Sequence, residues 1–479
     1  MKNTVRITAL LLLLVLIILS GCTKDGNTDE PAKEQTVPAA SPSEPSQEQP
    51  EESEAPLPSD PTDPPTQTDA SEEPVHDQGE KDEQPEDGLD VKEETDSETS
   101  EKETEENPDV PAEPEEEDKP EDEENPSEEQ VQDNERPSFV PAIAGEYIRN
   151  ALDTMTLEEK VGQMFLASYP GYGAREDAAD YHLGGYLFFA SFFEERYPSE
   201  ASDDIAYIQD GCDIPMFIAV DEEGGSVCRV SCFEQYRSTK FRSPRSVLDE
   251  GGLEHAREDC AEKSQLLLSL GVNMNLGPVC DVTSDTDAFM YWRSPGSDAE
   301  TVCDFVSVVV SEMNAQGIGG ALKHFPGYGN NLDTHTQIVY DYREMEHFEQ
   351  TDFLPFKAAI EAGAGCIMVS HSIVQCMDPY RPASLSKAVN DILRNELGFD
   401  GVLMTDDISM SAVTDYTDGY EAAVMAVEAG NDLICCSDFY TQVPAVVSAV
   451  ESGRISEDRI DQSVERILRL KLSLGIIEI

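Results

Sequence analysis

Short apolar runs recur along residues 139–479, and the segments between them carry apolar residues at helical spacing. Such runs are typical of strands that are buried on both faces of a parallel sheet. We predict strands at residues 163–168, 185–189, 216–220, 272–276, 319–322, 366–369, 401–404 and 432–435. Strands that alternate with helices in this way favour an α/β fold of the TIM type, a (β/α)8 barrel.

The first helix of this region has a recognisable start. Thr156 is followed three residues later by Glu159, just before the apolar residues Val161 and Met164. This spacing is typical of a capping box, in which each side chain accepts a hydrogen bond from the other residue's backbone. We therefore predict that a helix begins here.

Polar residues follow several of the predicted strands. They are Asp221, Asp281, Lys323, His324, His371 and Asp406. The carboxyl ends of the strands form the catalytic face of a TIM barrel, so this distribution predicts one shared active site. Any one of these residues could instead be a core group or a support for a neighbour.

The N-terminus has the pattern of an export signal. A short basic region precedes an apolar run at residues 7–19, which is too short for a comfortable membrane span. The sequence LSGC at 19–22 resembles a bacterial lipobox. We predict a lipoprotein signal peptide at residues 1–21, with a lipid on Cys22 that anchors an extracytoplasmic protein to the outer face of the bacterial cell membrane. The alternative is an uncleaved anchor.

The charge distribution separates the next segment from the folded part. The chain has a formal net charge of −67, which argues against a nucleic-acid partner. Residues 23–138 hold 43 acidic against 7 basic residues, among many Pro, Ser, Thr and Gln. Such a segment cannot bury a core, so we predict a disordered acidic linker at residues 22–138, either a tether or a solubilising spacer. The folded domain is then residues 139–479.

Cysteine is abundant, with eleven residues in the chain. Disulfides are permitted outside the cytoplasm, but spacing alone cannot assign pairs. No CxxC pair with partner histidines occurs, so we predict no zinc site. Cys280 and Cys366 lie in apolar runs and are expected in the core.

Two segments carry candidate chemistry, LKHFPGYGNNLDTHT at 322–336 and MTDDISM at 404–410. Glycoside cleavage needs a carboxylate at the anomeric carbon and a separate proton donor for the departing oxygen. Asp406 can be the first and His335 the second, because an imidazole titrates near neutrality. Asp333 could orient His335. The alternative is a loop closed by Asp333, with an exposed and idle His335.

Several motifs resemble one known family across essentially the whole folded part. Besides MTLEEKVGQMF from residue 155 and SVERILRLKLSLGII near the end, they are DEEGGSVCR at 221–229, GVNMNLGPVCD at 271–281, RSPGSD at 293–298 and KHFPG at 323–327. Their order and spacing are similar to those of glycoside hydrolase family 3, in its single-domain, NagZ-like β-N-acetylhexosaminidase branch.

The resemblance implies a role for each matching residue. Asp406 is the nucleophile and Asp333 with His335 the acid/base dyad, while Asp407 faces elsewhere because neighbouring side chains at a strand end alternate. Sugar-binding roles are implied for Asp221, Arg229, Arg293, Lys323 and His324. Lys323 and His324 could instead form buried ion pairs, and His371 either binds substrate or packs in the core.

Five positions depart from the family's common form. Tyr328, Asn330 and Asn331 stand where the catalytic loop usually reads GHGDT, and Ser226 and Cys228 replace a common arginine and glutamine. The first set affects loop conformation and substrate preference. The Ser226 change removes positive charge near the site.

The function implied is an exo-acting, retaining β-N-acetylglucosaminidase that removes terminal N-acetylglucosamine from cell-wall fragments or related glycans. Its partners are this carbohydrate and, through Cys22, a membrane; no metal or organic cofactor is implied. A phosphorylase, in which phosphate replaces water, or another family 3 β-glycosidase would use the same residues. A non-catalytic wall-binding lipoprotein is the alternative from another class, although Asp333, His335 and Asp406 argue against it.

Overall fold

The computed structural model of the chain describes residues 142–479. The predicted signal peptide at 1–21, the lipidated Cys22 and the acidic linker at 22–138 lie outside these residues. One parallel sheet of eight strands forms the centre. Its strands are β1 (Phe165–Ser168), β2 (Gly185–Phe188), β3 (Phe217–Val220), β4 (Met274–Asn275), β5 (Gly319–Phe325), β7 (Cys366–Val369), β9 (Val402–Thr405) and β10 (Ile434–Cys436).

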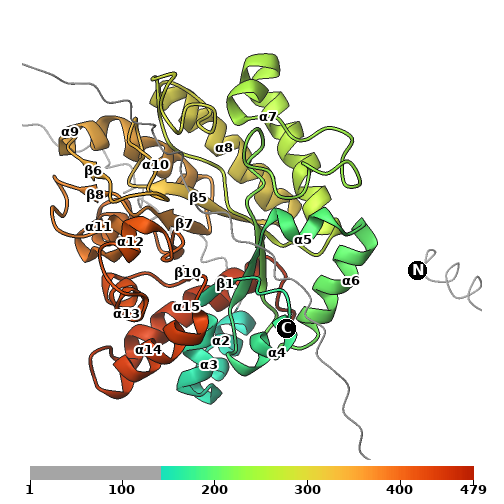
Figure 1. Ribbon diagram of the computed structural model, residues 1–479, viewed down its shortest axis with the longest axis vertical. Helices are drawn as coiled ribbons and strands as arrows, with labels where there is room; N and C mark the ends of the chain where they lie inside the picture. Colours follow the sequence, from blue (N-terminus) through green and yellow to red (C-terminus); the bar gives the residue numbers. More distant parts are fainter. Residues whose placement is uncertain (1–141) are drawn as a thin grey trace, which may run out of the picture. The chain divides into compact units, whose positions relative to one another are not determined.

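The sheet curves into a nearly closed barrel (Figure 1). The strand order is β10-β1-β2-β3-β4-β5-β7-β9, so the last two strands approach each other from the two edges. A parallel bridge between Met404 and Leu433 joins them. The Thr405 hydroxyl adds a contact, because it accepts the Cys435 N–H at 3.1 Å. The predicted TIM-type barrel is confirmed.

All eight predicted strands are present, with differences at their ends. Gln163, predicted as strand, is the last residue of a helix, and its buried side chain amide donates to the His182 carbonyl (2.8 Å). The fifth strand was predicted to stop at Leu322, but it continues to Phe325. Lys323 and His324 are therefore strand residues, and their polar side chains hid the end of the strand from the hydrophobic pattern.

Helices surround the barrel (Figure 1). They are α2 (Ala142–Thr154), α3 (Leu157–Gln163), α4 (Ala174–Asp180), α5 (Ala190–Glu194), α6 (Pro198–Gln209), α7 (Pro244–Ser269), α8 (Ala299–Gln316), α9 (Met345–His347), α10 (Phe353–Glu361), α11 (Lys387–Asp391), α12 (Ser411–Thr414), α13 (Gly419–Ala429), α14 (Phe439–Glu451) and α15 (Glu457–Ser473). The predicted capping box is confirmed at α3: Glu159 N–H donates to the Thr156 hydroxyl at 3.2 Å, and Thr156 N–H donates to the Glu159 carboxylate at 2.7 Å. A small second sheet pairs β6 (Tyr340–Asp341) with β8 (Ile373–Val374).

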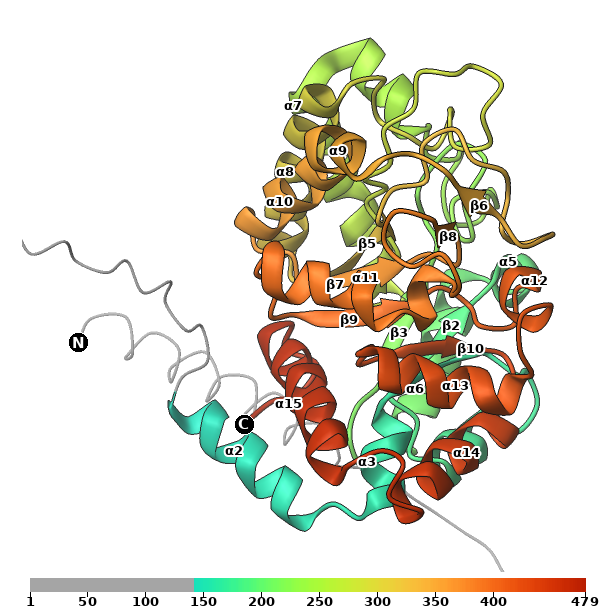
Figure 2. The ribbon, with the colours of Figure 1, turned by 90° about the vertical axis from the view of Figure 1, so that its left-hand side faces the viewer.

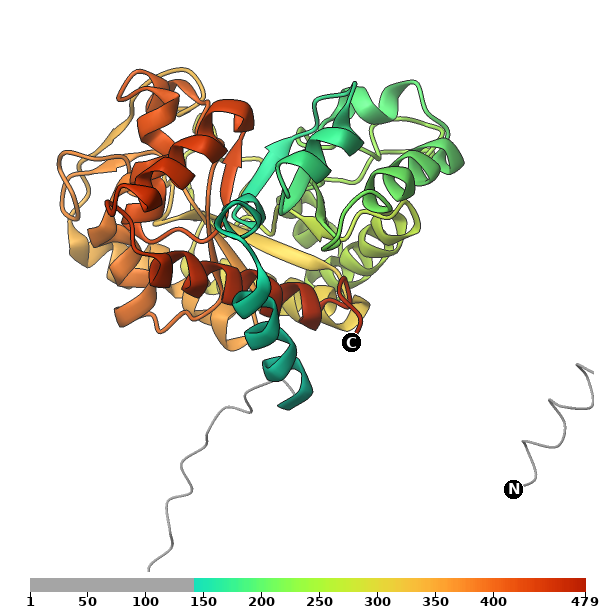
Figure 3. The same cartoon turned by 90° about the horizontal axis from the view of Figure 1, so that it is seen from below.

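The first and last described helices lie side by side. α2 runs alongside α15 in Figure 2, and in Figure 3 the same pair, teal and dark red, lies near the C-terminus. None of the helices within residues 142–479 is long and apolar enough to cross a membrane. Cys280 and Cys366 are buried in the core as predicted, and the ten cysteines of the described region form no disulfides.

Candidate active site

The loop after β3 carries two of the predicted sugar-binding residues, Asp221 and Arg229. Buried Glu222 closes this loop, because its carboxylate accepts the backbone N–H groups of Arg229 and of the next residue at 2.7 and 2.8 Å. Gly224 has φ +104°, and a Cβ there would collide with neighbouring backbone. The glycine thus permits the turn that brings Arg229 back within 3.6 Å of Asp221.

Lys323 and Arg293 form a buried charge cluster with two carboxylates. Lys323 Nζ lies 2.7 Å from both Asp221 and Glu223, and the Arg293 guanidinium donates to both Glu223 oxygens at 2.7 and 2.9 Å. Burial alone would raise the pKa of Glu223, but Arg293 and Lys323 hold it well below its usual range. The buried ion pair considered for Lys323 is therefore present, and it fixes both cations in place.

His324 connects this cluster to the catalytic loop. Its Nδ1 lies 2.7 Å from an Asp281 oxygen, whose partner oxygen accepts the Tyr328 N–H at 2.6 Å. Arg293 donates to Nε2 of His324 at 3.3 Å. Since an arginine only donates, Nε2 accepts this bond when the ring is neutral, and Nδ1–H then donates to Asp281.

The loop that carries the predicted dyad is held by a buried tyrosine. The Tyr328 hydroxyl accepts the Thr334 N–H at 2.9 Å and pairs with the Thr334 hydroxyl at 2.7 Å. Burial raises the pKa of Tyr328, so its phenol stays protonated. Arg343 donates to the Gly327 carbonyl at 2.8 Å at the start of the loop. The loop is thus anchored at Gly327, where it begins, and at Thr334, next to Asp333.

Asp333 and His335 form the predicted pair. An Asp333 oxygen lies 2.6 Å from Nδ1 of His335 and also accepts the His335 backbone N–H at 3.0 Å. The His335 side chain is 59% exposed. Nδ1 is held by the carboxylate, so Nε2 is the nitrogen available to a bound molecule.

Asp406 follows β9 and is partly buried. One of its oxygens accepts the Asp407 N–H at 2.9 Å. Burial alone would raise the pKa of Asp406, but the imidazoles of His371 and His324, the Asp407 N–H and His335 together hold it below its usual range. The barrel therefore brings together an ionised strand-end carboxylate and the groups predicted around it.

His371 and Asp407 lie behind Asp406. His371 is fully buried; its Nε2–H donates to the Asp407 carbonyl at 3.0 Å, and its Nδ1 contacts the Ser384 hydroxyl at 2.7 Å. Burial lowers the pKa of His371. This is the arrangement expected of its packed-core alternative. The Asp407 carboxylate accepts from Ser409 N–H at 2.9 Å and from the Ser437 hydroxyl at 3.1 Å, so it faces other partners, as predicted.

A comparison with known proteins now decides the family. Residues 156–470 match the glycosyl hydrolase family 3 N terminal domain. The chain belongs to glycosyl hydrolase family 3. The predicted family is confirmed, and the chain is a glycosidase.

The relatives of this glycosidase include β-hexosaminidases and a β-N-acetylglucosaminidase. A β-hexosaminidase of Nitrosomonas eutropha is 31% identical over 301 residues, which cover 60% of this chain and 85% of that protein. β-Hexosaminidase A of Pseudoalteromonas piscicida is 28% identical over 323 residues, covering 61% of this chain and 54% of that protein. A solved family 3 β-N-acetylglucosaminidase from a Paenibacillus species is 33% identical with a TM-score of 0.64, covering 67% of this chain and 63% of that one.

Three residues of the family 3 site have partners that the sequence did not predict. Glu223 fixes Lys323 and Arg293, Asp281 fixes His324, and Tyr328 anchors the loop. Asp281 had a signal, because it follows a strand like the other site residues. Glu223 lies two residues after Asp221 in the same motif, but its partners come from distant segments, which no local pattern reveals.

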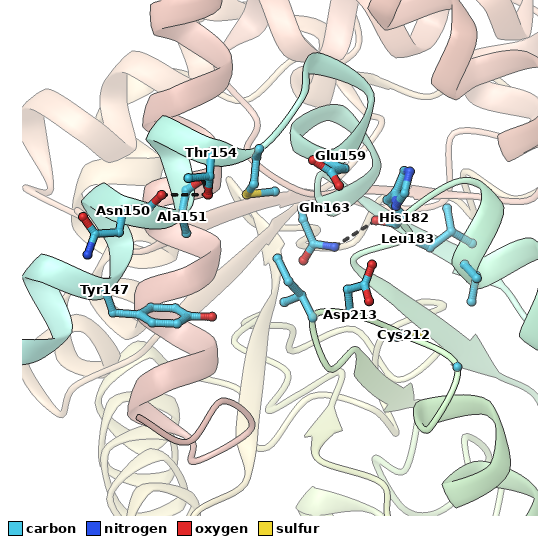
Figure 4. Close-up of a pocket in the computed structure, with 15 residues that line it drawn as sticks. Tyr147, Asn150, Ala151, Thr154, Glu159, Gln163, His182, Leu183, Cys212 and Asp213 are labelled. Carbon is cyan, nitrogen blue, oxygen red and sulfur yellow. Dashed lines mark hydrogen bonds between the residues drawn. The ribbon is translucent and has the colours of Figure 1, made fainter.

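A separate cavity of about 460 Å³ lies at the other end of the glycosidase barrel (Figure 4). Gln163, Leu183 and Ile214, which line it, precede the first three strands, whereas the site residues lie after a strand or in the last three residues of one. None of the predicted site residues lines this cavity. Among residues 142–479, no group of three or more His, Cys, Asp or Glu side chains is placed to hold a metal ion.

Proposed function

We propose that the chain is an exo-acting, retaining β-N-acetylglucosaminidase. The observation that carries this proposal is the pairing of an ionised strand-end carboxylate, Asp406, with an exposed imidazole, His335, that a carboxylate holds through its other nitrogen. A nucleophile and a separate proton donor are the two groups that a retaining glycosidase needs.

The reaction runs in two steps. Asp406 attacks the anomeric carbon while protonated His335 gives its Nε2 proton to the departing oxygen, and a glycosyl ester forms. Water then attacks the same carbon, His335 takes up its proton, and Asp406 leaves as a carboxylate. Asp333 accepts the Nδ1–H of His335 throughout and stabilises the imidazolium form, as an aspartate does in hydrolase triads.

The sugar bound at this site is terminal N-acetylglucosamine. Relatives named β-hexosaminidase and β-N-acetylglucosaminidase support this choice. Asp221, directly after β3, and Arg229, in the loop that follows, offer an acceptor and a donor, and both side chains are partly exposed. Lys323 and Arg293 are buried and stabilise the carboxylates of the sugar site. They therefore contact the sugar only at the bottom of the site.

The biological setting is the outer face of a bacterial membrane, where a lipid on Cys22 and the acidic linker at 22–138 let the domain reach cell-wall fragments or related glycans. The export pattern at residues 7–22 and the acidic composition of the linker support this part of the proposal. Metabolic labelling with a fatty-acid analogue, compared between the native chain and Cys22→Ala, tests it. Equal labelling of the two proteins would contradict the proposed lipid anchor on Cys22.

The activity is tested with nitrophenyl glycosides. We expect rapid release of nitrophenol from the β-N-acetylglucosaminide and much slower release from the β-glucoside. The same assay in phosphate buffer should yield free N-acetylglucosamine; sugar phosphate as the main product would establish the phosphorylase alternative. If folded protein turns over neither substrate, the result would favour the alternative of a non-catalytic binding lipoprotein.

A further inference from the structure

An aromatic side chain lies beside the proton donor without a role in the reaction described above. Phe289 belongs to the segment between β4 and α8. Its ring centroid lies 6.5 Å from that of His335 and 5.9 Å from that of Tyr328, and it is 39% exposed. The Arg293 guanidinium lies 5.3 Å from the same ring centroid. Phe289 thus lies next to both the buried Arg293 and the exposed His335.

The position of Phe289 determines what it meets. His335 gives its proton to the departing oxygen in the proposed reaction, so a surface beside His335 lies where the leaving group departs. Three neighbours, His335, Tyr328 and Arg293, lie against the ring before substrate arrives and restrict its motion, which lowers the cost of ordering on binding. The exposed part of the ring is a flat apolar surface.

The charges around Phe289 indicate the class of leaving group. Arg293 is the cation nearest to the ring, and its guanidinium is already paired with Glu223. Within the described residues it is therefore not a free partner for an anion. Leu332, directly before Asp333 in the catalytic loop, is 64% exposed and adds apolar surface. An uncharged ring with an apolar face suits this surface better than a charged group does.

Single exposed aromatic residues are common and need no explanation. Phe289 differs from such a residue because it contacts the proton donor and a buried arginine of the sugar site. We propose that Phe289 is the stacking platform for the leaving group, and that this leaving group is an uncharged pyranose, as in a β-linked oligosaccharide. The inference rests on the proposed glycosidase function and names its leaving-group specificity. Of the two proposed substrate sources it favours related glycans over cell-wall fragments, in which the leaving sugar carries a carboxylate.

The test compares two leaving groups of similar acidity. N,N′-Diacetylchitobiose leaves a sugar, whereas trifluoroethyl β-N-acetylglucosaminide leaves an alcohol about as acidic as a sugar hydroxyl but without a ring. Both need the same proton from His335. We expect Phe289→Ala to lower kcat/KM for the disaccharide roughly tenfold, mainly through KM, and for the trifluoroethyl glycoside by less than about threefold.

Equal losses on the two substrates would show that Phe289 acts through His335 or through the fold, and would overturn the platform while leaving the glycosidase function intact. A native chain that cleaves neither substrate would overturn both proposals. Phe289→Leu keeps the bulk against His335 and loses the flat face, so it should reproduce the selective loss. Phe289→Tyr should retain native selectivity. Tyr207→Ala is the matched control, an exposed aromatic residue near the opposite end of the barrel, and should leave both rates unchanged.

Discussion

At the scale of single residues, the site depends on which groups are charged. Asp406 keeps its negative charge despite partial burial, because surrounding imidazoles lower its pKa. Burial lowers the pKa of His371, which lies behind Asp406. Asp333 holds His335 at the surface, where the imidazole can exchange protons with water. The proposed nucleophile and the proposed acid are thus separated by environment as well as by position.

The role of His335 predicts a dependence on the leaving group. Activated aryl glycosides hardly need protonation, whereas alkyl and sugar leaving groups need it fully. His335→Ala should therefore lower kcat by about 10²- to 10⁴-fold for an unactivated N-acetylglucosaminide and far less for the dinitrophenyl glycoside. Asp333→Ala should give a weaker version of the same pattern. Steady-state kinetics over a series of leaving groups measures this, and equal losses across the series would remove His335 from the role.

At the scale of elements, the catalytic loop keeps its shape through Tyr328. This tyrosine is one of the positions that depart from the family's common form, and its hydroxyl serves both polar groups of buried Thr334. Gly327, with φ +123° and a Cβ position occupied by Asp352, begins the loop. The loop therefore depends on its own internal contacts rather than on the GHGDT sequence.

Tyr328→Phe tests this dependence. The change leaves the Thr334 N–H and hydroxyl buried without their partner, which costs about 1–3 kcal/mol. We expect a lower melting temperature and a roughly tenfold loss of kcat on unactivated substrates, because the dyad is less well positioned. Tyr342→Phe, at a residue that is 75% exposed, is the control and should behave as the native chain. Unchanged kinetics and stability in Tyr328→Phe would contradict the anchoring role.

A second element-scale prediction concerns the packing of α15 on α3. Lys471 is completely buried, and its ammonium contacts the Gln163 side-chain oxygen at 2.8 Å. Burial lowers the pKa of Lys471 from 10.5 to about 7. Between these pH values the unfolded chain holds a proton that the folded chain has lost, so this group makes folding more favourable as pH rises.

Lys471→Met should remove this dependence. At pH 7 and below, the folded native chain bears nearly the full penalty for burying the charge, so we expect the variant to be more stable by roughly 2–4 kcal/mol. The gain should shrink as the pH approaches 10. Urea unfolding at pH 6, 7 and 9 measures it, with Lys387→Met, at an exposed lysine, as the control. A gain that does not change with pH, or a loss, would rule out this account.

At the scale of the whole molecule, the sequence predicts the barrel better than it predicts the site. Strands of a parallel barrel are buried on both faces, so all eight stand out as apolar runs. The local pattern fails where distant residues supply the partners. The buried side chain of Gln163 forms hydrogen bonds with Lys471 and with the His182 carbonyl. Lys323 can lie within a buried strand because Asp221 and Glu223 neutralise its charge. The same long-range pairing hid the roles of Glu223 and Asp281.

The separation of linker and barrel gives a prediction for the whole chain. Residues 139–479 still carry 56 acidic and 23 basic residues, and salt screens charges beyond about 8–10 Å. Removing residues 23–138 should therefore leave solubility, activity on small substrates and the pH dependence of that activity unchanged. The pH–rate profiles of the two forms are the measurement. A truncated domain that is unfolded, or that has a different alkaline limb, would make the acidic segment part of the enzyme.

The central claim is that Asp406 attacks the sugar, and trapping the glycosyl ester tests it most directly. A 5-fluoro-N-acetylglucosaminyl fluoride slows both steps but keeps a good leaving group, so the ester accumulates. Peptide mapping by mass spectrometry should then find one fluorinated N-acetylglucosaminyl unit on Asp406, retained in Asp407→Asn and absent from Asp406→Asn. An adduct on Asp407, or no adduct from a chain that turns over the nitrophenyl substrate, would contradict the account.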